Sequence, residues 1–307
     1  MGGIKCTAIV NAACTSAKKS LRKTKFMRIL FEGIKNVVVS NAEISDLSWL
    51  IRQNRMVVLK PYFQMRNDEV AFRSVHEVVK NYLQVCGTLW LRRTKMERLG
   101  VPRCAVLLRY PLALLNIPSA YEEYLNAVGA KTRNRIRKAE KLGYEFREFE
   151  WDNHLEEIFD INNSKELRSA GPMQGWYRDQ VKPRHHSEIE KRYRKYYGLF
   201  KDDRLWAYCH LVLCGDFGFT KHFLGHANHL KNGIMNYLLS GMVHEYLDHS
   251  HVQWLNYGIF PTWSREGTVD FRKHTGFEGY AAFLDLEEDQ ELLKYSKRVR
   301  AIGLTNF

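Results

Sequence analysis

Three histidines stand close together in the chain, and an imidazole can accept a proton near neutral pH. His222, His226 and His229 fall at the end of an apolar, strand-like run and in the segment that follows it. A spacing of four along a strand places His222 and His226 on the same face. Their chemistry would be proton acceptance or substrate orientation, and the alternative for each one is a partly buried histidine with a backbone partner. A metal site would need a further ligand, and no HExxH-like pattern occurs, so we expect no metal.

A second group of side chains could bind phosphate. The segment from Lys131 to Lys141 reads as a helix, and four-residue spacing puts Arg133, Arg137 and Lys141 on one stripe. Such a stripe suits a nucleic-acid backbone, and a solvated helix face is the alternative. The whole chain has a formal net charge of +13, which favours anionic partners such as nucleic acid or phosphorylated cofactors.

The composition of the chain is that of an ordinary globular protein. It has 307 residues, of which 45% are hydrophobic and 26% are charged, enough for one domain and an extension. The six cysteines form no CxxC pair, and no clean signal peptide opens the sequence. No stretch approaches 18 uninterrupted apolar residues, so we expect a cytoplasmic protein without a membrane span.

The helices and strands that must position these groups can be predicted in the second part of the chain. The segment 112–119, with Pro111 and Pro118, is interpreted as the connection between an N-terminal α/β extension and this second part. Turn residues at 202–204 and 215–218 separate strand-like runs and predict antiparallel hairpins. The predicted helices are 120–128, 131–142, 154–163, 187–196, 233–247 and 269–274, and the predicted strands are 144–150, 197–201, 205–214, 219–226, 252–257 and 280–286.

This order of elements resembles the GNAT acyltransferase fold, over roughly residues 120 to 286. The stretch 270–278 (DFRKHTGFE) looks like the F-(Y/K)-x-x-x-GF close of that superfamily. The stretch 131–143 is similar to the R-x-x-I-R-K-A-x-K-x-G helix of FemABX-like proteins, a related group that uses aminoacyl-tRNA as donor. The resemblance implies an α+β fold, with a mixed, mainly antiparallel sheet flanked by helices. The domains we expect are an N-terminal α/β extension (1–115), a GNAT-like domain (116–290) and a basic C-terminal tail (291–307).

The resemblance also implies where the acyl donor would bind. In acetyl-CoA enzymes the donor loop reads (R/Q)-x-x-G-x-(G/A), and its N–H groups hold a pyrophosphate at a helix N-terminus. Aligned on Gly233, this chain has Leu230 in the first position and Met235 in the last, so only the central glycine survives. That departure disfavours acyl-CoA and favours aminoacyl-tRNA. The candidate donor-binding residues are Lys231, Asn232, Gly233, Arg272 and Lys273.

A proton donor is implied at the strand that splays from its neighbour in GNAT-like folds. Here that strand ends in Asn256-Tyr257-Gly258, and a tyrosine hydroxyl there can protonate a leaving group. The alternative is an aromatic side chain that caps the core. With the histidines, the candidate catalytic residues are Tyr257, His226, His222 and Asn256.

The leading hypothesis from the sequence is an N-acyltransferase that transfers an acyl group directly from acyl-CoA to an amine. The acceptor would be a small molecule or a peptide. The first alternative is a FemABX-like aminoacyltransferase that uses aminoacyl-tRNA and therefore binds tRNA. The second is a nucleic-acid-binding protein that keeps the fold as a scaffold without catalysis.

Overall fold

The computed structural model describes residues 41–59, 79–80, 88–89, 91, 93–102, 105–168, 171–173, 175–247, 251–260 and 266–285. The chain divides into two units, Met1–Ile44 and Ser45–Phe307, and the sheet and the candidate site belong to the second. The tail predicted at 291–307 lies outside the described residues. None of the helices within these ranges is long and apolar enough to cross a membrane.

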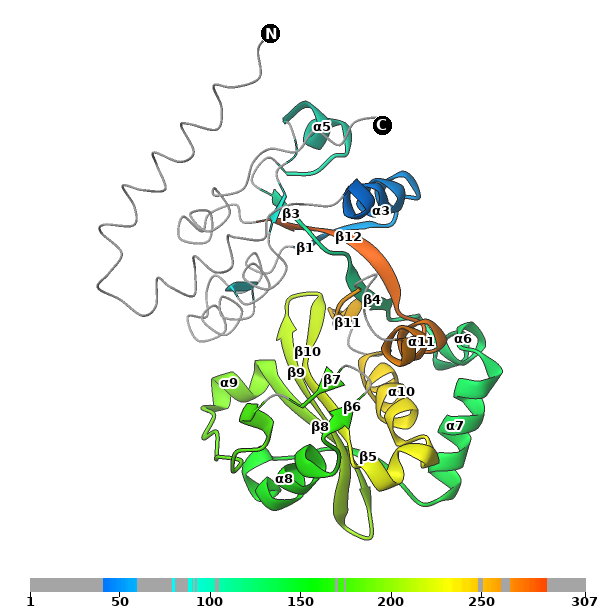
Figure 1. Cartoon of the computed structure of the whole chain (residues 1–307), viewed down its shortest axis with the longest axis vertical. Coiled ribbons are helices and arrows are strands. Elements are labelled where there is room, and N and C mark those ends of the chain that lie inside the picture. Colours follow the sequence, from blue (N-terminus) through cyan, green and yellow to red (C-terminus); the bar gives the residue numbers. More distant parts are fainter. Residues whose placement is uncertain are drawn as a thin grey trace, which may run out of the picture. The chain divides into compact units, whose positions relative to one another are not determined.

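A ten-stranded sheet organises the second unit, in the order β2-β3-β12-β4-β11-β10-β9-β8-β5, with β1 beside β12 (Figure 1). Most neighbours are antiparallel, while β1 runs parallel to β12 and β10 runs parallel to β11. This confirms the predicted mixed, mainly antiparallel sheet. The strands are β1 (Met56–Leu59), β2 (Thr88–Leu89), β3 (Ala105–Leu108), β4 (Leu112–Asn116), β5 (Glu145–Glu148), β8 (Arg194–Lys201), β9 (Arg204–Cys214), β10 (Phe217–Gly225), β11 (Trp254–Ile259) and β12 (Glu278–Asp285).

Helices cover both faces of the sheet. The helices α6, α7 and α10 lie on one side of the strands and α8 lies on the other (Figure 1). Apolar side chains of α6, α7 and α10 form one core against the strands, and those of α8 form another. Because β9 lies between these layers, it is apolar and buried almost throughout rather than alternating. The helices are α3 (Asn41–Arg52), α5 (Arg93–Arg98), α6 (Tyr121–Ala127), α7 (Ala130–Lys141), α8 (Leu155–Asn163), α9 (Glu188–Tyr193), α10 (Ile234–Leu247) and α11 (Glu266–His274). Short elements are the 3-10 turns η2 (Trp151–Asn153), η3 (Gly175–Tyr177) and η4 (Ala227–Asn232) and the hairpin of β6 (Leu167–Arg168) and β7 (Gly171–Pro172).

The two predicted hairpins are present, and the second strand of one of them, β10, begins earlier than predicted. Asp202 and Asp203 have φ values of +53° and +56°, as a tight turn matching the twist of β8 and β9 requires. The second turn needs only Gly215 and Asp216, because Phe217 already pairs with Cys214. The strand β10 therefore starts before the predicted residue 219.

Two predicted segments differ from the structure. The supposed connection 112–119 contains β4, a buried strand between β12 and β11, because its leucines fill the core on both faces. The predicted helix 187–196 ends at Tyr193, and the residues from Arg194 pair with β9 instead. The domain boundary at 115/116 stays a prediction, although the sheet itself continues across it.

Candidate active site

The central feature of the site is the place where two parallel strands separate. β10 and β11 pair from Phe217 with Trp254 to Phe219 with Asn256, and the pairing ends there. Beyond this point β10 is shifted by an irregularity between Thr220 and His222, while β11 continues along β4. We call this region, after Phe219 and Asn256, the splay. The strand predicted at 252–257 corresponds to β11 and lies beside β10, as expected.

Asn256 holds the backbone at the splay. Its side chain is fully buried; Nδ2 donates to the carbonyls of Ala113 (3.2 Å) and Gly258 (2.9 Å), and Oδ1 accepts from the Gly258 N–H (2.8 Å). From β10, the Thr220 hydroxyl donates to the Asn256 carbonyl (2.7 Å). Because its amide is engaged in this way, Asn256 is built to position the strand, and direct chemistry would have to come from its neighbours.

Tyr257 lies in an aromatic cluster on the α10 face of the sheet. Its ring is 5.3 Å from Phe223, 5.8 Å from Phe271 and 5.6 Å from Phe277 between centroids. The Arg272 guanidinium stands over the ring, 5.1 Å from its centroid, and Arg272 itself is buried. Burial raises the pKa of Tyr257 and the charge of Arg272 acts in the opposite direction, so the hydroxyl stays protonated at neutral pH.

His222 lies on the other face of the sheet. It neighbours Phe223 on β10, and successive side chains of a strand point to opposite faces. Its Nδ1 is 2.8 Å from the Tyr177 hydroxyl, and its ring lies 5.6 Å from that of His210 on β9. Burial, helped by the charges of Arg184 and Lys221, lowers the pKa of His222 to about 3. It is therefore a neutral hydrogen-bonding group, a poor base for a protonated amine.

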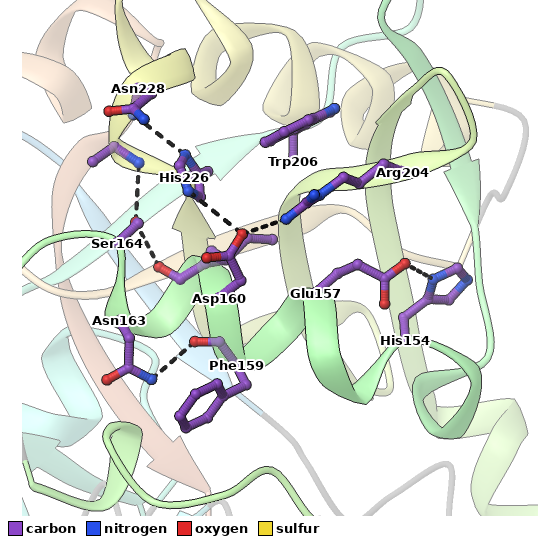
Figure 2. A network of polar contacts seen from close by, with 12 residues as sticks. His154, Glu157, Phe159, Asp160, Asn163, Ser164, Arg204, Trp206, His226 and Asn228 are labelled. Atoms are coloured by element: carbon purple, nitrogen blue, oxygen red, sulfur yellow. Dashed lines mark hydrogen bonds and ion pairs between the residues drawn. The ribbon is translucent and has the colours of Figure 1, made fainter.

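His226 belongs to a polar network on the same side as α8 (Figure 2). It begins η4, with its Nδ1 accepting from the Asn228 N–H (3.4 Å), while its Nε2 lies 3.6 Å from Asp160 Oδ2. Arg204 donates to the same carboxylate oxygen at 2.6 Å. Trp206 stands edge-on to the His226 ring at 5.4 Å. Both imidazole nitrogens are thus used to fix the start of the loop, which argues for a positioning role.

The predicted donor loop is packed against α7. The Lys231 carbonyl accepts from Lys138 Nζ (3.0 Å), and Asn232 donates to the Tyr144 hydroxyl (3.1 Å). Gly233 has φ +85°, and a Cβ there would lie 2.3 Å from the Arg135 carbonyl oxygen. The glycine is therefore required by its conformation and by the approach of α7, which is a structural reason independent of any phosphate.

The remaining predicted residues have different surroundings. Arg133 donates through Nη1 to the carbonyls of Leu125 (2.9 Å) and Val128 (2.5 Å), so it caps the C-terminus of α6. Arg137 and Lys141 are exposed on α7, and Lys273 is exposed on α11. The structure thus brings Asn256, Tyr257 and Arg272 together. Of the predicted basic stripe, Arg137 and Lys141 are exposed and Arg133 is not.

Sequence reasoning missed His210, Arg184 and Asp160. His210 is fully buried, and Arg184 donates to its Nδ1 at 2.8 Å. A histidine inside the continuous apolar run of β9 is a signal that could have drawn attention to the first of them. The other two are visible only once the fold brings distant segments together.

A cavity of about 510 Å³ lies apart from the splay, between the end of β5 and the start of β8. Tyr196 forms part of its lining, with charged side chains of both signs around it. Several of these charges pair with one another, such as Lys195 with Glu148 (2.9 Å) and Lys191 with Glu150 (3.7 Å). Within the described ranges, no group of three His, Cys, Asp or Glu side chains is arranged to hold a metal ion.

The buried, neutral His222 predicts acid sensitivity of the fold. In the unfolded chain its pKa returns to 6.5, whereas the folded value is about 3. The unfolded state therefore binds more protons below pH 6.5, so stability present above that pH is lost as the pH falls toward 3. At pH 5 we expect a loss of about 2 kcal/mol in unfolding free energy from this group. Urea unfolding at pH 8 and pH 5 measures it, and His222→Gln should flatten the dependence; an equal slope in both proteins would contradict the assignment.

No family model matches the chain, and no curated protein gives a significant match. Among solved structures, FemX matches with 10% identity and a TM-score of 0.45, over 59% of this chain and 62% of FemX. The C-terminal domain of a putative lysylphosphatidylglycerol synthetase from Agrobacterium fabrum matches with 14% identity and a TM-score of 0.41. The match covers 67% of this chain and 71% of that domain's chain. A GNAT-family putative acetyltransferase from Novosphingobium aromaticivorans matches with 13% identity and a TM-score of 0.32, over 59% of this chain and 66% of the acetyltransferase. All three identities lie between 10% and 14% and all three TM-scores lie below 0.5, so the chemistry is argued from the site alone.

Proposed function

We propose that this chain is an N-acyltransferase, which transfers an acyl group from acyl-CoA directly to the amine of a small molecule or peptide. The observation that carries the proposal is the splay, where Tyr257 and Arg272 meet beside a backbone held open by Asn256. An extended donor can lie between two strands that stop pairing, in the way that peptides add to a strand edge.

The side chains at the splay suit the transfer step. As the amine nitrogen bonds to the acyl carbon, the bond from that carbon to the leaving group breaks; the nitrogen releases one proton to solvent, the leaving group takes one from the protein, and the protein group regains its proton from solvent. The hydroxyl of the partly buried Tyr257 is protonated at neutral pH and can supply it. The buried Arg272 cation beside the ring favours the negative charge that develops in this step.

The fit of a CoA pyrophosphate at the donor loop is partial. Lys231 supplies a cation and α10 supplies a helix N-terminus, both of which attract phosphate. Gly233 instead faces the Arg135 carbonyl, and the Met235 sulfur lies within 2.6 Å of where a Cβ of Gly225 would stand. The loop is thus filled by its own side chains more than the usual glycine-rich loop would be.

Binding experiments with the full chain test the proposal. We expect saturable binding of acyl-CoA by calorimetry, and release of free CoA thiol when an amine acceptor is added. Mass spectrometry of ligands that co-purify with the protein would identify the donor. If the protein binds neither CoA nor tRNA, the acyltransferase proposal is overturned.

Aminoacyl-tRNA is the alternative donor, favoured by exposed Arg137 and Lys141 on the helix that packs against the donor loop. If tRNA binds there, Arg137→Glu with Lys141→Glu should weaken binding and lower the slope of log affinity against log salt by about one per lost contact. Filter binding at several salt concentrations measures this. Arg192→Glu, at an exposed position of α9, is the matched control, and Arg133 is left intact because it caps α6. The control changes the net charge by two units and the double variant by four, so an equal loss of affinity per unit of charge would show that only overall charge matters.

A further inference from the structure

Exposed apolar side chains gather on the elements from α8 to η3. Phe159 on α8 is 40% exposed, Leu167 on β6 is 53% exposed and Trp176 on η3 is 52% exposed. Pro172 on β7 is exposed as well. Single exposed apolar residues are ordinary, but a group of them on neighbouring elements marks a surface that binds something. We call these four side chains the apolar patch.

Contacts between the elements hold the apolar patch together. Leu167 and Pro172 are paired across the β6–β7 hairpin, so their side chains share one of its faces. Glu166, beside Leu167, pairs with Arg178 at 3.7 Å, two residues beyond Trp176, and α8 packs against η3. The Phe159 ring points away from His226 and the polar network of α8 (Figure 2).

The segment that carries most of this patch is basic. Residues 163–186 include five lysines and arginines but only two carboxylates, in a chain whose formal net charge is +13. Lys165, Arg178 and Lys182 are exposed, and we call them the basic flank. Large apolar side chains beside lysines and arginines are typical of segments that lie at the surface of an anionic bilayer.

Trp176 is held in place before anything binds to it. Its ring stacks on Tyr177 at 3.7 Å between centroids, and the Tyr177 hydroxyl lies 2.8 Å from Nδ1 of His222 on β10. A side chain that is already ordered loses little conformational entropy on binding. Tryptophan is also enriched at the boundary between headgroups and acyl chains, where its ring is in contact with both.

A second copy of the chain fits this surface less well than a bilayer. A two-fold contact would place the basic flank against itself, and like charges that face each other weaken binding. A protein partner would also need a complementary hollow for each exposed side chain, whereas fluid lipids adapt to side chains of different size.

We propose that the apolar patch and the basic flank form a docking surface for an anionic phospholipid bilayer. The apolar side chains enter the boundary between headgroups and acyl chains, and the lysines and arginine contact the anionic headgroups. The protein then lies on the bilayer without crossing it. This inference does not depend on the proposed acyl transfer, and its tests need no substrate.

Sedimentation of the full chain with vesicles tests the apolar patch. We expect binding to vesicles of phosphatidylcholine and phosphatidylglycerol, and roughly tenfold weaker binding to phosphatidylcholine alone. Leu167→Ser with Trp176→Ser should lower binding to the mixed vesicles at least roughly tenfold. Leu142→Ser with Trp49→Ser is the matched control, because Leu142 is 37% exposed beyond α7 and Trp49 is 49% exposed on α3.

The control pair should bind like the unchanged chain. Since all four side chains are exposed, each variant should also keep the unfolding temperature of the unchanged chain. An equal loss of binding in both pairs, or no binding of the unchanged chain to the mixed vesicles, would overturn the proposal. A dimer in solution that Leu167→Ser dissociates, without vesicle binding, would instead assign the patch to a second copy.

Charge reversal tests the basic flank. Lys165→Glu with Lys182→Glu should remove the preference for phosphatidylglycerol. Lys131→Glu with Lys141→Glu, at exposed positions near the ends of α7, changes the net charge equally and should retain that preference. If both pairs lose it to the same extent, the overall charge attracts the lipid and the proposed surface does not.

Fluorescence quenching shows which tryptophan meets the lipid. Phospholipids that carry bromine on their acyl chains should quench the fluorescence of the unchanged chain and of Trp49→Ser. The quenching should be largely lost in Trp176→Ser. Vesicle binding in which Trp176 contributes nothing to the quenching would mean that another surface binds the bilayer, and the proposal would fail.

Discussion

Tyr257→Phe is expected to lower turnover roughly a hundredfold, the scale of losing one acid–base partner. The phenyl ring keeps its contacts with Phe223, Phe271 and Phe277, so the aromatic cluster and the fold should persist. Substrate affinity should barely change, since the hydroxyl acts mainly in the transition state. Single-turnover rates and thermal unfolding, measured on the same preparation, give both quantities.

A matched control separates chemistry from packing. Tyr280 is a partly buried tyrosine of the same sheet, stacked edge-on against Trp254 at 5.1 Å, and Tyr280→Phe removes the same atom elsewhere. We expect nearly normal turnover in that variant. Unchanged turnover in Tyr257→Phe would remove Tyr257 from the mechanism, and a fall in activity that matches a fall in stability would make it a core residue.

Local signals explain why the centre of the fold could be predicted from the sequence. The paired aspartates at 202 and 203 favour positive φ, and apolar runs on both sides give the hairpin of β8 and β9. Gly143 ends α7 with φ +78°, as expected of a glycine just beyond a helix. In each case the residues that decide the structure are adjacent in the chain.

Long-range pairing explains what could not be predicted. The strand β4 lies between two prolines, and only its position between β12 and β11, whose residues come more than a hundred positions later, makes it a central strand. The capping role of Arg133 depends on carbonyls of the preceding helix. Neither pattern differs in sequence from a connection or a solvated helix face.

The candidate site shows the same division. The sequence resemblance predicts the strand end at Asn256 and Tyr257, because the order of elements identifies the strand that separates from its neighbour in GNAT-like folds. The partnership of His222 with His210 depends on the register between β9 and β10, and that of His222 with Tyr177 depends on a loop that folds back over the strand. Gly233 was identified by a donor-loop pattern, yet its nearest neighbour is the backbone of α7.

Gly233→Ala is the substitution from which we expect the largest loss of stability. The residue sits at φ +85°, where an L side chain is strained by about 1–2 kcal/mol. Its new Cβ would also stand 2.3 Å from the Arg135 carbonyl oxygen, a backbone atom that cannot turn aside. Moving α7 away should cost about 1–3 kcal/mol more, the usual range for overpacking a filled site. Urea unfolding of the full chain at neutral pH measures the sum.

Gly143→Ala measures the backbone strain by itself. Gly143 has nearly the same φ, +78°, but nothing lies within 4 Å of an added Cβ, so only the backbone strain remains. The difference between the two variants therefore reports how closely α7 is pressed against the donor loop. Equal losses in the two proteins would mean that α7 yields without cost, and the donor loop would then be free to open for a phosphate. A larger loss in Gly233→Ala would establish that this glycine is needed to seat α7, whatever ligand the predicted donor loop binds.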